Sequence, residues 1–202
     1  MTGVENPILL DFPEQFETQH LILKAPKIGD GYMINEAIRE SHAELKPWLT
    51  WADPLPSPEK SEEMNRLSVV SFLRREVFRM NVHQKSDGLF VGVTSLHHID
   101  WSVPAFEIGY WVRTSFAGKG YARESVMGIT DFAFGVLSAQ RMEIRCDPRN
   151  DRSAAVAQKA GYTLEGTIRH DMRERDDTLS SAYVFSMIRP EWEARQQSQT
   201  KV

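Results

Sequence analysis

Residues 106–123 read FEIGYWVRTSFAGKGYAR, and this stretch predicts a strand, a glycine-rich turn and the start of a helix. The apolar run 106–112 is typical of a buried strand, and apolar residues recur at helical spacing from Gly120 to Leu137. Gly118 and Gly120 allow backbone conformations in which several N–H groups converge on one anion. The following helix would add its free N–H groups and its positive dipole end, so the turn suits a pyrophosphate group.

The turn by itself does not identify a ligand, because ordinary connections between a strand and a helix also carry glycines. It lacks the Gly-Lys-Ser/Thr ending of a nucleotide-binding P-loop. It also lacks the third glycine and the acidic residue about twenty positions later that mark a dinucleotide site. Lys119 and Arg123 do supply positive charge beside the turn.

Patterns on either side of this stretch predict a mixed α/β protein with a single sheet. Strands are expected at 19–25, 78–84, 89–99, 106–112, 141–146, 164–169 and 181–187. Helices are expected at 29–44, from Ser57 or Ser61 to about 75–78, at 120–137 and at 151–160. In the second helix the residues expected to face the core are Leu67, Val70, Phe72 and Leu73. An antiparallel meander that leads into a strand–helix–strand unit predicts a mostly antiparallel mixed sheet with helices on both faces.

The composition indicates one ordinary globular domain. The chain has 202 residues, of which 41% are apolar and 26% charged, with a formal net charge of -4. We expect an N-terminal arm over residues 1–17, a domain over 18–192 and a polar tail over 193–202. The acidic balance argues against a broad nucleic-acid-binding face. No apolar run is long enough to span a bilayer and no signal sequence is evident, so we expect a cytoplasmic protein.

The chain has a single cysteine, Cys146, which excludes an internal disulfide and a cysteine-rich zinc site. Its position in a predicted central strand is typical of a small buried residue rather than a nucleophile. No metal is expected from these patterns.

Seven short blocks in order give the chain a resemblance to a known family. They are TQHLILK at 18–24, PW at 47–48, FVG at 90–92, EIGYWV at 107–112, GKGYA at 118–122, NDRS at 150–153 and AGYTLEG at 160–166. The series resembles the GCN5-related N-acetyltransferases, and more narrowly the Rim-type branch that acetylates the N-termini of ribosomal proteins. The resemblance runs from about Thr18 to Trp192. It implies acetyl-CoA as co-substrate and a sheet in which one parallel pair of strands splays apart.

The resemblance also implies roles for particular residues. Backbone groups of Trp111, Val112 and Arg113 would bind the pantetheine arm, and one N–H there would polarise the thioester carbonyl. The residues that would bind the pyrophosphate are Ala117, Gly118, Lys119, Gly120, Tyr121, Ala122 and Arg123. Asn150 would meet the pantetheine amide, and Ser153 would donate a proton to the departing thiolate.

Two positions depart from the family pattern. Ala117 stands where Arg or Gln is usual in the phosphate-binding loop, and His20 replaces an arginine that is common in the first strand. Because backbone amides do much of the binding in that loop, we expect CoA binding to persist with less side-chain support.

Glu107 is the candidate general base, because it interrupts an apolar strand beside the expected reaction centre. A solvated strand residue is the equal alternative. His170 and Asp171 are second choices. His97 and His98 are adjacent in a predicted strand, so at most one of them is expected to face the cleft.

Other candidates have structural alternatives as well. Asn150 and Ser153 are suited to capping the helix that follows them. Trp48 and Trp51 would either overhang the acceptor site or pin a loop to the core. The charged run 169–177 is more typical of a solvated hairpin than of a recognition site.

The leading hypothesis is acetyl transfer from acetyl-CoA to a primary amine, preferably the N-terminus of a ribosomal protein. The amine would attack the thioester directly, without a covalent enzyme intermediate. One alternative acceptor is a small-molecule amine such as an antibiotic, a toxin, an amino acid or a polyamine. Another alternative, which Ala117 leaves open, is a non-catalytic CoA-binding sensor. Neither nucleic acid nor a membrane is an expected partner. A homodimer is expected only because dimers are common in the family that the chain resembles.

Overall fold

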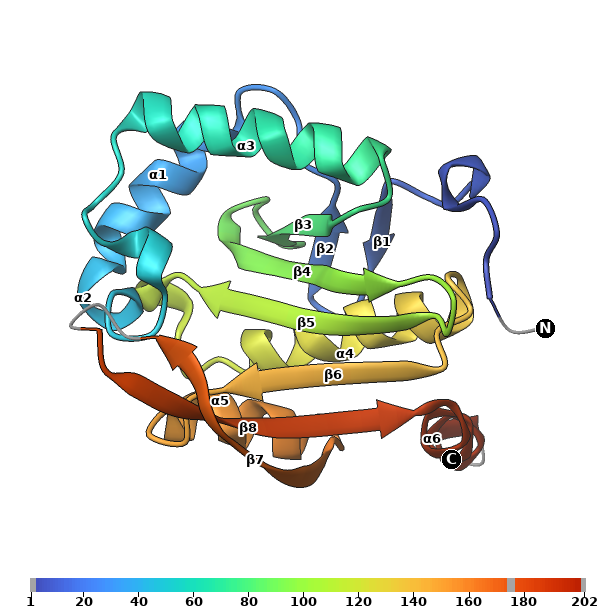
Figure 1. The fold of residues 1–202 in the computed structure, drawn as a ribbon. Coiled ribbons are helices and arrows are strands. Elements are labelled where there is room, and N and C mark those ends of the chain that lie inside the picture. Colours follow the sequence, from blue (N-terminus) through green and yellow to red (C-terminus); the bar gives the residue numbers. More distant parts are fainter. Residues whose placement is uncertain (1–2, 174–176, 201–202) are drawn as a thin grey trace.

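A computed structural model describes residues 3–173 and 177–200, and it shows an eight-stranded sheet with helices on both faces (Figure 1). The strands are β1 (Gln15–Glu17), β2 (Leu21–Lys24), β3 (Phe78–Gln84), β4 (Phe90–Asp100), β5 (Ala105–Val112), β6 (Arg141–Cys146), β7 (Thr163–Arg173) and β8 (Leu179–Ile188). The α-helices are α1 (Asp30–Glu40), α2 (His42–Leu45), α3 (Pro58–Leu73), α4 (Tyr121–Gly135), α5 (Asp151–Lys159) and α6 (Arg189–Thr200). Short 3-10 helices are η1 (Pro7–Leu9), η2 (Thr50–Ala52) and η3 (Thr114–Phe116). The strands and helices predicted from the sequence are all present, and the first predicted helix is divided at Ser41.

The strands lie in the order β1-β2-β3-β4-β5-β6-β8-β7. Among the described strands, β5 and β6 are the one parallel pair, and the other neighbours are antiparallel. The parallel pairing is short, because it joins Ala105–Glu107 to Arg141–Glu143 while β5 continues to Val112. The two strands therefore separate beyond this pairing. The predicted mixed sheet with one splayed parallel pair is confirmed.

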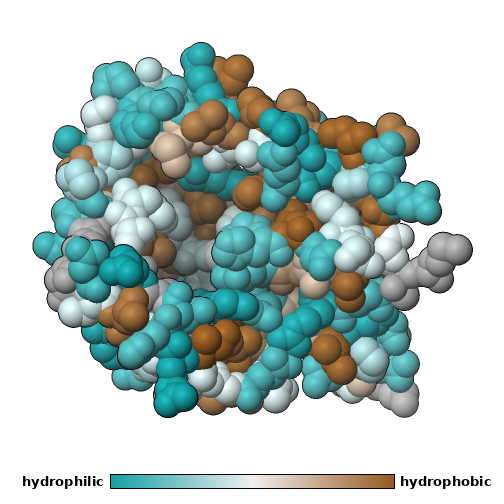
Figure 2. All heavy atoms as spheres, viewed as in Figure 1, coloured by the Kyte–Doolittle hydropathy of each residue, from teal (hydrophilic) through white to brown (hydrophobic). Residues whose placement is uncertain are grey.

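The two faces of the sheet are covered unequally. On one face, α4 buries Val126, Ile129 and Ala133 against the strands, and α5 lies beside it. On the other face, α1 packs against Phe90 and Trp111, and α3 lies over β3. No described helix lies over β6 and β8 on this second face (Figure 1). In the same view, hydrophilic residues spread over much of this uncovered half (Figure 2).

Helix α3 buries polar side chains, contrary to the sequence prediction. Three of the four residues predicted to be buried there are exposed, namely Leu67, Val70 and Leu73. Glu62 is buried instead, because its carboxylate accepts the backbone N–H groups of Gly29 and Gly31 at 2.9 and 3.0 Å. These bonds satisfy free N–H groups at the start of α1. The polar face of α3 therefore holds α1 in place, a role that hydrophobic periodicity does not reveal.

The chain ends are more closely integrated than the sequence predicted. Gln15–Glu17 pair with β2 as an edge strand, and the Phe12 ring packs edge-on against Phe132 with centroids 5.7 Å apart. Within the expected N-terminal arm 1–17, Phe12 and β1 thus contact the rest of the domain. At the other end, the polar residues from 193 onward continue α6, whose Trp192 donates a hydrogen bond to Asp131 at 2.7 Å. Over the described ranges, no helix combines the length and apolar character that crossing a membrane requires.

Candidate active site

The candidate site lies where β5 and β6 separate. The backbone N–H of Arg113 donates to the carbonyl of Val91 at 2.8 Å, and the Trp111 carbonyl also faces β4. Successive peptide groups of a strand point to opposite edges, so the N–H groups of Tyr110 and Val112 point into the gap. Of the three backbone positions predicted to bind a ligand, Val112 is therefore the one that offers a free donor there.

The glycine-rich turn leads from the end of β5 into α4. Gly118 and Gly120 have φ angles of 77° and 83°, and a Cβ atom at either would meet open space. Tyr121 and Ala122 form the first turn of α4 and are half-buried. Among the described residues, the backbone N–H groups of 118–123 have no hydrogen-bond acceptor. A run of free N–H groups at a helix N-terminus is the arrangement that binds phosphate groups.

Side chains add little to the turn beyond two cations. Lys119 and Arg123 are exposed and supply positive charge. The side chain of Arg113 points elsewhere and pairs with Glu40 of α1. Ala117 is exposed and brings no polar group. An anion on this turn would therefore be held chiefly by backbone N–H groups.

Ser153 lies on the α5 side of the gap and contacts β5. Its Oγ lies 2.8 Å from the hydroxyl of Tyr110, which also donates to the Ser153 carbonyl at 3.0 Å. Burial raises the pKa of Tyr110, so its phenol stays protonated at neutral pH. Asn150 caps α5 by accepting the Ser153 N–H at 3.0 Å through Oδ1, which leaves its Nδ2 group available. Cys146 is buried as predicted, and burial raises the pKa of its thiol.

Glu107 lies on the opposite face of the sheet, which α1 partly covers. Along β5, Tyr110 packs with the α4 side of the core, whereas Glu107 shares the face of Trp111. The Glu107 side chain is 15% exposed, with Oε2 2.8 Å from Nδ1 of His98 and 3.7 Å from Nε of Arg145. The gap therefore has a carboxylate on one face and a pair of hydroxyls on the other.

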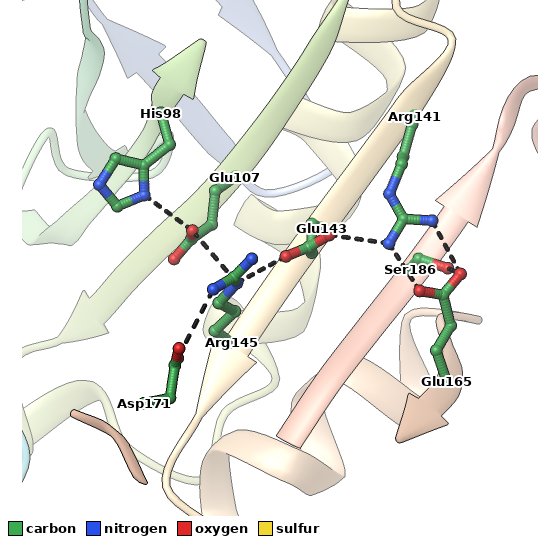
Figure 3. A network of polar contacts seen from close by, with 8 residues as sticks. All are labelled: His98, Glu107, Arg141, Glu143, Arg145, Glu165, Asp171 and Ser186. Atoms are coloured by element: carbon green, nitrogen blue, oxygen red, sulfur yellow. Dashed lines mark hydrogen bonds and ion pairs between the residues drawn. The ribbon is translucent and has the colours of Figure 1, made fainter. Parts of the chain in front are cut away.

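A network of charged side chains extends from Glu107 across β6 to β8 (Figure 3). Glu143 accepts hydrogen bonds from Arg145 at 2.6 Å and from Arg141 at 2.7 Å. Asp171, predicted as a second-choice base, lies 3.5 Å from Arg145 and belongs to this network. The network borders a hollow of about 220 Å³ lined by His98, Ala105, Phe106, Glu107, Arg141, Glu143 and Arg145.

His97 and His98 lie on the same face of the sheet, contrary to the alternation expected of adjacent strand residues, and of the two only His98 lines the hollow. His98 has a φ of 46°, and the pairing of β4 with β5 shifts register between His97 and Asp100. This bulge turns His98 toward the face that His97 occupies, so the two rings lie with centroids 4.8 Å apart. The His97 ring lies over Gly109, where an added Cβ would be 2.9 Å from Nε2. Burial lowers the pKa of His97.

The remaining candidates lie at the margins of this region. Trp48 and Trp51 are 40% and 45% exposed, and the Trp51 ring centroid is 6.2 Å from that of Trp111. Trp51 therefore contacts the core while part of its ring stays exposed. His170 is exposed and takes no part in the charged network among the described residues. Part of the predicted hairpin 169–177, residues 174–176, lies outside the described residues.

Comparison with known proteins places this fold in a family. The family model described as an acetyltransferase (GNAT) domain matches residues 20–163. The chain belongs to the GNAT acetyltransferase family. The ribosomal-protein-serine acetyltransferase of Escherichia coli (strain K12) is 30% identical over 127 residues, which cover 61% of this chain and 70% of that protein. YdaF of Bacillus subtilis (strain 168), a proposed ribosomal N-acetyltransferase, is 28% identical over 178 residues, which cover 87% and 94% of the two chains.

A solved GNAT structure shows the same fold. It is the ribosomal L7/L12 alpha-N-protein acetyltransferase RimL in complex with coenzyme A. The TM-score is 0.79 at 22% identity, and the match covers 87% of this chain and 98% of RimL.

Two features of this GNAT site were not predicted. The contact between Tyr110 and Ser153 was missed, because the two residues are 43 positions apart and only the packing of α5 on the sheet brings them together. The charged network was missed as well, although the alternation of Glu143 and Arg145 in one strand is a signal that both face the same side.

Proposed function

We propose that this GNAT protein transfers the acetyl group of acetyl-CoA directly to the N-terminal amine of a protein. One observation carries the proposal: the gap between β5 and β6 has Glu107 on one face and the Tyr110–Ser153 pair on the other. A thioester in the gap would be reached by an amine from the side of Glu107. Its sulfur would lie toward the hydroxyl pair.

The residues around the gap fit acetyl-CoA. The free N–H groups of 118–123 suit its pyrophosphate, and Lys119 and Arg123 add charge. The N–H of Val112 is directed to stabilise negative charge on the thioester oxygen, an effect commonly worth a few kcal/mol. Asn150 keeps its Nδ2 group for a pantetheine carbonyl while Oδ1 caps α5.

The proton transfers follow from the two faces of the gap. The amine nitrogen forms a bond to the carbonyl carbon, the C–S bond breaks, and the amine proton passes to Glu107, directly or through a water. The departing sulfur is protonated through the Ser153 hydroxyl, which is held by Tyr110 and regains a proton from solvent, while Glu107 releases its proton to solvent, so that both groups are restored. An α-amino group with a pKa of about 7.7–8.0 is roughly one-tenth neutral at pH 7, so a weak base is sufficient for this acceptor.

The preference for a protein acceptor rests on the surface and on the relatives. The half of the sheet over β6 and β8 is uncovered by helices, so an extended peptide has access to it. The exposed rings of Trp48 and Trp51 offer apolar contacts for such an acceptor. Relatives named for acetylation of ribosomal proteins favour an N-terminus on such a protein. This proposal places the protein in the cytoplasm, where ribosomal proteins are made.

The test is the rate of CoA release with a matched panel of acceptors. We expect turnover with peptides that begin with a free N-terminus, and loss of turnover when the same peptides carry a blocked N-terminus. Turnover with polyamines or amino acids alone would assign the site to a small molecule. Binding of acetyl-CoA without turnover on any acceptor would support a non-catalytic sensor.

A further inference from the structure

Three potential metal ligands converge on the uncovered face, beside the proposed reaction centre. One atom each of His97, His98 and Glu107 lies within 4.8 Å of the other two. Among residues 3–173 and 177–200, these three side chains are the one group placed closely enough together to share a metal ion. The convergence depends on the bulge at His98, because in a regular strand the two rings would point to opposite faces.

The backbone at His98 is unusual for a residue with a side chain. A φ of 46° lies in the left-handed region, which costs a non-glycine residue free energy and is often found at functional positions. Gly109 contributes from the neighbouring strand, because any side chain there would collide with the His97 ring. Two separate local features therefore hold the two imidazoles on one side of the sheet.

The ligand types fit a transition-metal ion. Two histidines and one glutamate, with a further position open to solvent, are a ligand set known for zinc. Zinc bonds to these atoms are about 2.0–2.2 Å long, so the ligand atoms around one ion lie roughly 3–3.5 Å apart. The His98 side chain is 77% exposed and free to close that distance. No described residue hydrogen-bonds to the His97 ring, so its nitrogen atoms are available to a metal ion.

The nearby arginine does not prevent binding. Arg145 Nε lies 3.7 Å from Glu107 but only 2.6 Å from Glu143, and its guanidinium also faces Asp171. Arg145 thus keeps two carboxylate partners if Glu107 turns to a cation. The hydrogen bond between His98 and Glu107 would be replaced by two bonds to the ion.

We propose that His97, His98 and Glu107 form a binding site for a divalent transition-metal ion of the zinc type. The ion is not needed for acetyl transfer. It occupies the carboxylate that the proposed reaction uses as base, so bound zinc inhibits the enzyme. The inhibition rests on the proposed function, whereas the binding does not. The sequence patterns excluded a cysteine-rich zinc site and gave no expectation of this one.

The test is calorimetric titration of zinc chloride into the full chain, freed of any histidine tag and treated with a chelator. Acetyl-CoA is left out, so that the result does not depend on catalysis. We expect one ion per chain with a dissociation constant of about 10 μM or lower. His97→Gln and His98→Asn should each weaken binding by about tenfold or more. Asparagine is chosen at 98 because it tolerates the left-handed backbone.

The matched control is His83→Gln, which removes another half-buried strand histidine and should bind zinc like the parent protein. Melting temperatures of the apo variants establish that each one is folded. Failure to bind zinc up to about 1 mM would overturn the proposal, as would parent-like binding by both the His97 and His98 variants. A second readout is inhibition of acetyl transfer by zinc, reversed by chelator and reduced in His98→Asn.

Discussion

The hydroxyl of Tyr110 lies 2.8 Å from Oγ of Ser153, and this contact links β5 to α5 on the α4 side of the open strand pair. Glu107, three residues earlier in β5, points to the other face. The proton acceptor and the proton donor proposed for the reaction are therefore separated by the sheet itself. This arrangement leads to a test of whether the hydroxyl pair acts as one unit.

Replacing Ser153 by alanine should lower kcat by about tenfold to a hundredfold while changing the affinity for CoA little. The reason is that the hydroxyl acts on the departing sulfur, whereas the backbone of the turn binds the pyrophosphate. Tyr110→Phe should lower kcat in the same direction, because it removes the group that positions the Ser153 hydroxyl. Steady-state kinetics together with calorimetric CoA binding measure both effects.

The double variant should be no slower than the slower single variant if the two hydroxyls form one unit. Additive losses would show that they act independently. Equal losses of kcat and of CoA affinity in Ser153→Ala would instead indicate a purely structural role at the start of α5.

Ala117 offers a gain-of-function test of the phosphate-binding turn. Ala117→Arg should tighten acetyl-CoA binding by about three- to tenfold, because it adds a cation at an exposed position beside free backbone N–H groups. The gain should shrink at high ionic strength, where exposed charges are screened. Ala117→Leu is the control without charge. A salt-independent gain, or equal gains in both variants, would contradict the electrostatic explanation.

Gly31 tests the contact between α1 and α3. A Cβ atom there would lie 2.2 Å from Cα of Glu62, so Gly31→Ala should destabilise the protein by about 3 kcal/mol. Gly135→Ala is the matched control, because it also lies in a helix but would meet nothing within 4 Å. We expect this control to be neutral or stabilising by up to about 1 kcal/mol. Urea unfolding measures both, and a mild effect of Gly31→Ala would mean that the helices can move apart.

Glu165 gives the β7–β8 pair a pH-dependent contribution to stability. The hydrogen bond from Arg141, and to a smaller extent the one from Ser186, lowers the pKa of Glu165 from 4.5 to about 2. The folded protein therefore keeps this carboxylate ionised to lower pH than the unfolded chain does. Its stabilisation is complete above about pH 4.5 and is lost as the pH falls toward 2.

Urea unfolding of Glu165→Gln at several pH values measures this contribution. The variant should be less stable than the parent at pH 6, by less than about 1 kcal/mol because the pair is largely exposed to solvent. The difference should shrink by pH 3. A difference that stays constant with pH would show that the carboxylate charge is not responsible.

The sequence predicted the element order well, and its errors have physical causes. Hydrophobic spacing located the main strands, because their buried faces need apolar side chains. It failed for α3, where buried Glu62 serves the backbone of α1. It also missed β1, since three residues at a sheet edge carry too little pattern, and the packing of Phe12 depends on residues far along the chain.

The candidate site was predictable in its backbone parts and less so in its side chains. The turn around Gly118 and Gly120 and the cap at Asn150 follow from local rules for glycine and for helix starts. The joint placement of His97 and His98 does not, because a single bulge reverses the alternation on which strand predictions depend.

The most direct test of the proposed function is the transfer of a deuterated acetyl group from acetyl-CoA to a peptide, followed by mass spectrometry. With the parent protein, we predict label on the N-terminal amine of the peptide and none retained on the enzyme. Glu107→Gln should lower the initial rate by about a hundredfold. Glu165→Gln, which alters the same charged network at a distance from the gap, should stay close to the parent rate. If the parent protein left the peptide unlabelled, the proposed transfer would be contradicted. If Glu107→Gln labelled the peptide as fast as the parent protein, the proposed role of Glu107 as base would be contradicted.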